Sequence, residues 1–396
     1  MAQAVTTSAG QNAVPADPRK EPEINKLFRA VVKLEGSDLH LKVGQPPMVR
    51  VKGLIRRLDH PPLTQEDMER LFLPIMKEQH RKVFFETGGV DFAHVLGDDE
   101  HRFRVNMFRQ RGKWGLVARR VNNVIPPFEK LGLLIPEQEK IRKPGEPATI
   151  EKLCMYDQGL IILAGVTGSG KSTTIAAMLE YINAREPVHI LTLEDPIEYL
   201  FQDKKAIVNQ REIYVDVCDW HTALKHAVRQ DPDVILVGEL RDRESFESAV
   251  HAAETGHLVF GTVHASSAAS TISRILDLFP PDMHGAIRQA LAFNLKAVIC
   301  QKLLPSIKPG KSRVPLLEIM IVNQVIRELI LKAEDKKIQD AIRLGYPEGM
   351  IDFNEHLRQL VEAGEISRET ALEVSPNPDA LKMALKGIKV AQPGIL

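Results

Sequence analysis

A glycine-rich segment that follows a short apolar run constrains this chain more than any other feature. Residues 165–172 read GVTGSGKS and match the pattern G-x-x-x-x-G-K-S/T in full. The apolar run 160–164 precedes them, and a helical pattern over 172–183 follows. Glycines let backbone N–H groups approach phosphate oxygens, and the N-terminus of the next helix favours negative charge. The segment therefore predicts a phosphate-binding loop between a strand and a helix of a parallel sheet.

We expect this loop to bind ATP together with Mg²⁺. Lys171 would reach the β- and γ-phosphate oxygens, and the hydroxyl of Ser172 would bind Mg²⁺. The other nucleotide-binding positions in the loop and at the start of the helix are Gly165, Thr167, Gly168, Ser169, Gly170 and Thr173. A chance match in a glycine-rich loop is the alternative, and the strand and helix on either side argue against it.

Two further strands are predicted to end in acidic residues. The apolar run 234–237 leads to Glu239, where a Walker B acid belongs, so we expect Glu239 to orient water or to contact the Mg²⁺ shell. The run 189–193 leads to Glu194 and Asp195. Because the ends of parallel strands gather at the ligand crevice, both acids are expected beside Glu239, Glu194 as a catalytic group and Asp195 at Mg²⁺, directly or through water. For Asp195, a turn before the next proline is the alternative.

Two histidines, His257 and His264, flank a fourth apolar strand, residues 258–262. An isolated histidine is usually structural, and the spacing assigns no carboxylate partner to either one. A catalytic or sensing role and a structural role are equally open for both.

Length and composition describe an ordinary chain of about two domains. Its 396 residues hold 52 Lys and Arg against 52 Asp and Glu, so the charge balance does not indicate nucleic acid. We find no signal peptide and no apolar run near the ~18 residues that a membrane span needs, and expect a cytoplasmic protein with no integral membrane segment. Three widely spaced cysteines, Cys154, Cys218 and Cys300, are predicted to be buried or incidental thiols.

Pattern changes along the chain predict five regions. Residues 1–22 are predicted to be a disordered tail, and residues 23–121 a small α+β domain with a capping box from Thr64 to Asp67 and a turn at Arg111-Gly112. Clustered prolines in 122–150 predict a linker. Residues 151–304 alternate strand and helix patterns, which predicts an α/β core, and 305–396 are expected to be helical. The helical pattern is expected to begin already at Ala268 and to be interrupted only near Pro305–Pro315.

Four segments together resemble a known family. GVTGSGKSTT, TLEDPIEY, RQDPDVILVGELRD and AETGHLVFGTVHASSA are similar, in order and spacing, to the Walker A, Asp box, Walker B and His box of the type II/IV secretion ATPase superfamily. Similarity to its PilT-like type IV pilus retraction ATPases also covers residues 37–58, 101–112 and 287–304, and VIRELI at 325–330 resembles their AIRNLI motif. Val166 stands where proline is usual in the family, and Leu240 where methionine is usual.

The resemblance implies a PAS-like N-terminal domain, a RecA-like ATPase domain and a homohexameric ring that works on an inner-membrane platform protein at the cytoplasmic face of the membrane. It places Glu194 and Asp195 in the Asp box and Glu239 in Walker B. It also places His257 and His264 in the His box. The family's phosphate-reaching arginines of the small domain fall on Arg102, Arg104 and Arg119.

Pilus retraction is the favoured function because the sequence lacks the tetracysteine motif and the extra N-terminal domain of the extension ATPases. A retraction-accessory or DotB-like secretion ATPase is one alternative. A nucleotide-gated regulatory subunit with little turnover is another. A nucleic-acid motor is disfavoured, because net charge is zero and basic stretches with interleaved aromatic residues are missing.

Overall fold

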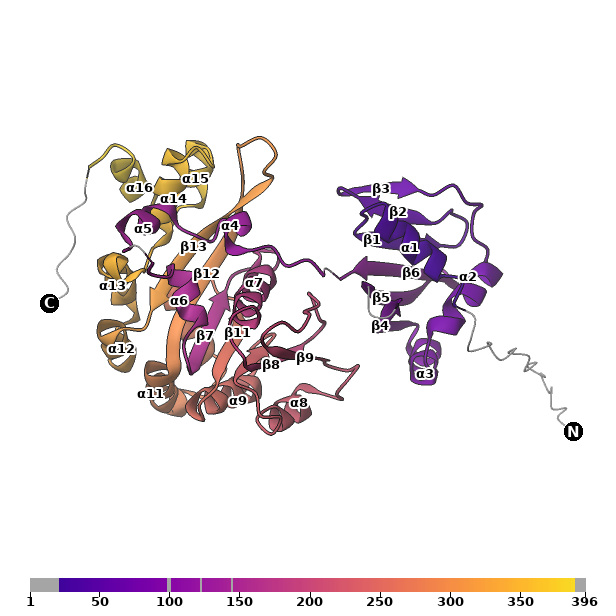
Figure 1. The fold of residues 1–396 in the computed structure, drawn as a ribbon, viewed down its shortest axis with the longest axis horizontal. Helices are drawn as coiled ribbons and strands as arrows, with labels where there is room; N and C mark the ends of the chain where they lie inside the picture. The colour runs from indigo at the N-terminus through magenta and orange to yellow at the C-terminus, as the bar shows by residue number, and fades with distance from the viewer. Residues whose placement is uncertain (1–20, 98–100, 122, 144, 389–396) are drawn as a thin grey trace, which may run out of the picture. The chain divides into compact units, whose positions relative to one another are not determined.

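The computed structural model describes residues 21–97, 101–121, 123–143 and 145–388. Contacts between residues divide the chain into two compact units, residues 1–122 and residues 123–396 (Figure 1). Residues 1–20 of the expected disordered tail lie outside the described part. No helix in that part is long and apolar enough to cross a membrane.

Over its described residues, the first unit is a six-stranded antiparallel sheet with three α-helices, as the α+β prediction expects. The strand order is β3-β2-β1-β6-β5-β4. The strands are β1 (Asp38–Lys42), β2 (Met48–Val51), β3 (Leu54–Arg57), β4 (Gly89–Leu96), β5 (His101–Gln110) and β6 (Lys113–Arg120). The helices are α1 (Asn25–Lys33), α2 (Gln65–Phe72) and α3 (Glu78–Thr87), with the short 3-10 helix η1 (Leu73–Ile75) after α2.

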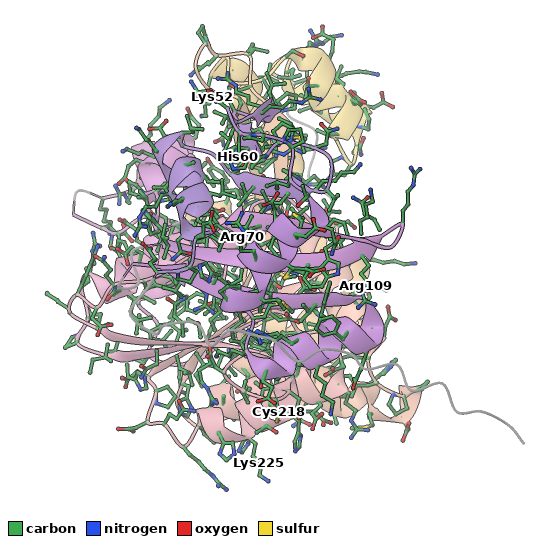
Figure 2. All side chains as sticks on the ribbon, turned by 90° about the vertical axis from the view of Figure 1, so that its right-hand side faces the viewer. Lys52, His60, Arg70, Arg109, Cys218 and Lys225 are labelled. Atoms are coloured by element: carbon green, nitrogen blue, oxygen red, sulfur yellow. The ribbon has the colours of Figure 1, made fainter. Side chains whose placement is uncertain are left out.

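Local sequence signals account for this unit. The capping box at the start of α2 is confirmed, since Thr64 Oγ1 accepts from Asp67 N and Asp67 Oδ2 accepts from Thr64 N. The turn between β5 and β6 is confirmed as well, with φ of 49° at Arg111 and 74° at Gly112. Two exposed residues of this unit, Lys52 and Arg109, are labelled in Figure 2, and the Arg109 guanidinium lies over the rings of Phe84 and Phe85.

The second unit contains a seven-stranded sheet in the order β13-β12-β7-β11-β10-β8-β9, parallel except for β13. The strands are β7 (Gly159–Ala164), β8 (His189–Glu194), β9 (Ile207–Glu212), β10 (Val234–Val237), β11 (Leu258–Val263), β12 (Leu295–Pro305) and β13 (Arg313–Ile321). Every residue of β7 is buried, with Leu160 and Ile162 in one core cluster and Ile161 and Leu163 in another. Two cores on opposite faces are typical of a parallel sheet covered by helices on both sides.

Helices of the second unit follow the strands and then continue towards the C-terminus. Before the sheet come α4 (Phe128–Leu131), α5 (Pro136–Ile141) and α6 (Thr149–Cys154). Within it come α7 (Lys171–Asn183), α8 (Trp220–Ala227), α9 (Arg243–Glu254), α10 (Ala268–Leu276), η2 (Pro281–Met283) and α11 (His284–Asn294). After it come α12 (Gln324–Leu331), η3 (Asp335–Lys337), α13 (Ile338–Leu344), η4 (Tyr346–Glu348), α14 (Phe353–Glu362), α15 (Arg368–Val374) and α16 (Pro378–Ala384).

The expected helical tail from Ala268, interrupted near Pro305–Pro315, is wrong on both sides of that interruption, where residues 295–305 form β12 and residues 313–321 form β13. These two strands form an antiparallel pair, and β12 also pairs with β7. The central part of each strand is buried throughout, so its residues show no alternation between apolar and polar. Periodicity alone cannot distinguish such a buried strand from a buried helix. The sheet that carries the phosphate loop therefore extends past Leu304, to Ile321.

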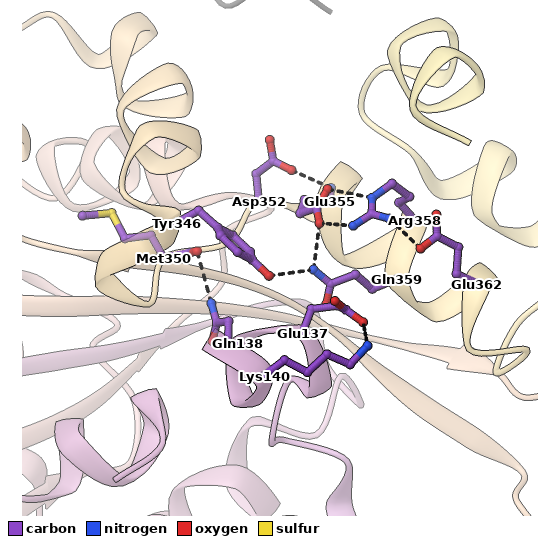
Figure 3. A network of polar contacts seen from close by, with 10 residues as sticks. All are labelled: Glu137, Gln138, Lys140, Tyr346, Met350, Asp352, Glu355, Arg358, Gln359 and Glu362. Carbon is purple, nitrogen blue, oxygen red and sulfur yellow. Dashed lines mark hydrogen bonds and ion pairs between the residues drawn. The ribbon is translucent and has the colours of Figure 1, made fainter. Parts of the chain in front are cut away.

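The segment expected to be a linker, residues 122–150, instead holds α4, α5 and the start of α6. Its side chains Phe128 and Ile135 are buried in a core cluster of the second unit. Gln138 Nε2 donates to the carbonyl oxygens of Gly349 (2.9 Å) and Met350 (3.2 Å), beside the polar network of α14 (Figure 3). A proline in the first turn starts α5, because the first N–H groups of a helix need no partner within it. Pro127 and Pro136 therefore lie at the starts of short helices and do not mark a free linker.

All three cysteines are free. Cys154 and Cys300 are buried, and Cys218 is exposed (Figure 2).

Candidate active site

The loop between β7 and α7 is a backbone cradle in which glycine is required. Gly165, Gly168 and Gly170 have φ of 152°, 77° and 92°, which other residues rarely adopt. A Cβ at Gly165 would lie 2.5 Å from the carbonyl oxygen of Gln301, and a Cβ at Gly170 would lie 2.6 Å from Gln301 Nε2. The loop thus lies directly against β12, and its turns need the glycines that the sequence supplies.

The polar groups of this loop fit a phosphate chain. Lys171 Nζ donates to the carbonyl oxygens of Gly165 (2.7 Å) and Val166 (3.1 Å). Burial lowers the pKa of Lys171, and the charge of Glu239 acts in the opposite direction. The hydroxyl of Ser169 is buried and has no hydrogen-bond partner among the described residues. A buried cation held only by carbonyls, beside an unpaired hydroxyl, is the environment in which a phosphate oxygen is favoured.

Residues at the start of α7 divide into exposed and anchored ones. Ser172 is exposed, as a Mg²⁺ ligand must be. Thr173 Oγ1 forms a 2.8 Å hydrogen bond with the hydroxyl of Tyr199, and Thr174 Oγ1 donates to Gln301 Oε1 at 2.7 Å. These two bonds tie the first turn of α7 to the segment after β8 and to β12. Thr167, in the loop itself, is exposed.

The structure brings three of the predicted site residues together at the ends of β8, β10 and β11. Glu239 Oε1 lies 3.3 Å from His264 Nε2, and Glu239 Oε2 accepts from Arg241 Nε at 2.7 Å. The guanidinium of Arg241 also lies 3.8 Å from Asp195 Oδ2. Glu239, Asp195 and His264 therefore form one charged cluster, in which Arg241 stands between the two carboxylates.

Glu194 is in a different environment from Glu239, although both follow strands of the same sheet. Its side chain is buried, and burial raises its pKa from 4.5 to about 7. Three hydrogen bonds act in the opposite direction, from Thr192 Oγ1 (2.7 Å), Gln210 Nε2 (3.3 Å) and the backbone N–H of Glu198 (3.3 Å). A carboxyl group poised near neutral pH has the pKa that a general base needs.

If Glu194 is the base, kcat/KM for ATP should rise with pH and have its midpoint near 7, since only the carboxylate accepts a proton. Thr192→Val removes a bond that favours the carboxylate, and should move this midpoint up by about one pH unit. Thr262→Val is the matched control, because that hydroxyl donates to Gly238 O instead. The measurement is the pH profile of ATP turnover. A midpoint unaffected by Thr192→Val would contradict the assignment.

The raised pKa of Glu194 also makes the free energy of unfolding depend on pH. Because the folded pKa of Glu194 lies above the unfolded value of 4.5, the protonated group is favoured by folding. Its contribution to the free energy of unfolding is full below pH 4.5 and is lost as pH rises through about 7.

The structure places His257 away from this cluster, which favours the structural one of the two roles that the sequence leaves open for it. β11 runs parallel to β7, and the phosphate loop follows the C-terminal end of β7. His264 follows the C-terminal end of β11, whereas His257 precedes its N-terminal end, roughly 20 Å away at about 3.3 Å per residue. There, His257 Nδ1 bonds to the carbonyl oxygen of Ala252 (2.8 Å) at the end of α9. The two histidines therefore lie at opposite ends of β11, and only His264 lies at the end where the phosphate loop is.

The three predicted arginines, Arg102, Arg104 and Arg119, belong to the first unit. Arg104 lies directly across from Arg119 in the β5–β6 ladder, and both are exposed. Arg119 Nε donates to the buried Asp38 Oδ1 at 2.9 Å. Their action at the phosphate loop stays a prediction.

Sequence reasoning missed two residues that shape the site. Gln301 was hidden inside a segment expected to be helical, although an amide in an otherwise apolar run is a usable signal. Arg241 was not singled out, although it lies two residues after Glu239 in the same motif.

Comparisons with known proteins show the family of this chain. The family described as type II/IV secretion system protein matches residues 19–372. PilT of Pseudomonas aeruginosa, a type IV pilus retraction ATPase, is 42% identical over 357 residues, which cover 90% of this chain and 99% of PilT. PilU of the same organism, a type IV pilus ATPase, is 38% identical over 364 residues, 92% of this chain and 91% of PilU.

The fold agrees as well. A crystal structure of the pilus retraction motor PilT with bound ADP superimposes with a TM-score of 0.81. It is 43% identical in sequence and covers 91% of this chain and 99% of that one. With its phosphate loop and acidic strand ends, the chain belongs to the type II/IV secretion system protein family.

Proposed function

We propose that this protein is the ATPase motor that retracts type IV pili. The observation that carries the proposal is the phosphate loop, with Lys171 buried at its end and Glu239 at the C-terminal end of β10 in the same sheet. The chain is an ATPase of its family, and its relatives include a pilus retraction ATPase and a twitching motility protein from Neisseria gonorrhoeae that is 38% identical over 335 residues.

Groups of this chain account for each part of ATP hydrolysis. Backbone N–H groups of the loop and Lys171 hold the β- and γ-phosphates, and the N-terminus of α7 adds a favourable dipole. Ser172, Glu239 and Asp195 would hold Mg²⁺, which neutralises charge on the phosphate oxygens. Glu239 orients the attacking water, and Glu194 takes its proton. His264 bonds to Glu239 and fixes its direction.

Assembly and location follow from the same family relationship. We infer a homohexameric ring with a PAS-like first unit and a RecA-like second unit. The ring acts on the platform protein of the pilus machine, at the cytoplasmic face of the inner membrane. The likeness to PilT over nine tenths of the chain supports this inference.

An accessory role in retraction is the second candidate, because PilU resembles this chain over almost the same length. Deleting the gene and scoring pili distinguishes the two. Cells with more surface pili and no twitching indicate the retraction motor, and cells that still twitch indicate the accessory role. Cells without pili would contradict both and indicate extension.

The arginines of the first unit carry a second part of the proposal. One or more of Arg102, Arg104 and Arg119 would reach the γ-phosphate only when the two units close, which would couple hydrolysis to movement. Such an arginine is worth about 10³-fold or more in rate. We expect at least one Arg→Ala variant to lose turnover by this factor while its ring still assembles in sedimentation. Three assembled variants with full turnover would disprove closure by these arginines.

A further inference from the structure

Arg241 occupies a position in the site that neither its motif nor the comparisons explain. Its Nε donates to Glu239 Oε2 at 2.7 Å, and its guanidinium lies 3.8 Å from Asp195 Oδ2. His264 is close to the other oxygen of Glu239, at 3.3 Å. Both carboxylate oxygens of Glu239 therefore have a partner, and Arg241 is the one whose charge is permanent.

The backbone around Arg241 is anchored on both sides. The N–H of Leu240 donates to Thr262 O (2.9 Å), and the Leu240 side chain is buried against Gly261 of β11. On the other side, Asp242 caps α9 by accepting from the N–H of Ser245. The guanidinium, in contrast, is half exposed. Because its backbone is fixed and its guanidinium is accessible to solvent, Arg241 can set the direction of the Glu239 carboxylate without being part of the core.

An exposed ion pair between residues two apart would ordinarily contribute little to stability. Here the guanidinium also separates two carboxylates that end neighbouring strands and would otherwise repel each other. We propose that Arg241 is a positioning residue for ATP hydrolysis, which holds the Glu239 carboxylate in its working orientation beside Asp195. The inference rests on the proposed ATPase function and adds to it a residue that acts through Glu239.

The test compares full-length Arg241→Gln with Arg243→Gln. Arg243 is a matched control, since it is two residues away, equally exposed and paired with a glutamate, Glu247, at 2.8 Å. We expect Arg241→Gln to lower kcat about 10–100-fold, as loss of a supporting contact usually does, with affinity for a non-hydrolysable ATP analogue and Mg²⁺ unchanged. Arg243→Gln should keep the parent kcat. Equal effects of the two changes, a parent or raised rate in Arg241→Gln, or a loss of nucleotide affinity would each overturn the proposal.

Two further variants separate positioning from folding and from direct contact with substrate. Arg241→Lys keeps the charge but lacks the planar fork, so its kcat should fall between the parent and Arg241→Gln at an unchanged unfolding temperature. In single-turnover experiments, the double variant Glu239→Gln with Arg241→Gln should hydrolyse ATP at the same rate as Glu239→Gln alone. A slower double variant would overturn the proposal. So would the parent kcat in Arg241→Lys if Arg241→Gln is unfolded. If the parent chain itself fails to hydrolyse ATP, the proposed function fails instead.

Discussion

Replacing Lys171 by alanine is expected to abolish Mg²⁺-dependent ATP hydrolysis, with a loss of about 10³-fold or more. The ammonium group lies at the end of the phosphate loop, where it donates to two loop carbonyls, and negative charge builds up between the β- and γ-phosphates as the bond to the γ-phosphate breaks. Lys171 is the only lysine in residues 165–172, so the loop itself holds no second ammonium group that could replace this charge.

The loss should not come from unfolding. Burial disfavours the charged form of Lys171. Removing the ammonium group therefore removes an unfavourable contribution to the folded state and does not destabilise the core. The measurement is steady-state ATP turnover with a thermal unfolding curve for the same sample. Lys225→Ala, at an exposed lysine labelled in Figure 2, is the control and should turn over ATP at the parent rate. Parent turnover in Lys171→Ala would contradict the site assignment as a whole.

Replacing Glu239 by glutamine is expected to preserve ATP binding and to lower turnover about 10²-fold or more. The amide oxygen of glutamine can still accept from Arg241 Nε, so the local geometry persists, whereas the negative charge that orients water is lost. The phosphate cradle is built from the loop and Lys171 and is unaffected. Glu239→Gln should therefore lose ATP turnover and keep its affinity for ATP.

Titration with a fluorescent ATP analogue and single-turnover hydrolysis measure the two effects independently. Glu247→Gln, on the exposed side of α9 and paired with Arg243, is the matched control, because it removes the same charge away from the loop. Equal losses of affinity and turnover in Glu239→Gln would show that the carboxylate maintains the fold of the site and has no separate part in the chemistry.

Most elements of the fold could be predicted because their signals are local. The phosphate loop, the capping box of α2, the turn at Arg111-Gly112 and the buried parallel strands follow from residues that are near one another in the chain. β12 and β13 could not be recognised, since a strand buried on both faces has no alternation. The short helices of residues 123–150 could not be predicted from the prolines alone, because proline ends helices but also fits their first turn.

The sequence by itself determined that a phosphate loop precedes a helix and that acids follow two strands of the same sheet. The tertiary structure decided which of these groups meet. Strand direction separated His257 from His264, which carry the same local signal, because only the C-terminal ends of parallel strands share the loop's edge. Burial, which depends on the whole packed sheet, gave Glu194 a pKa of about 7, and the approach of neighbouring strand ends placed His264 beside Glu239 and Asp195 beside Arg241.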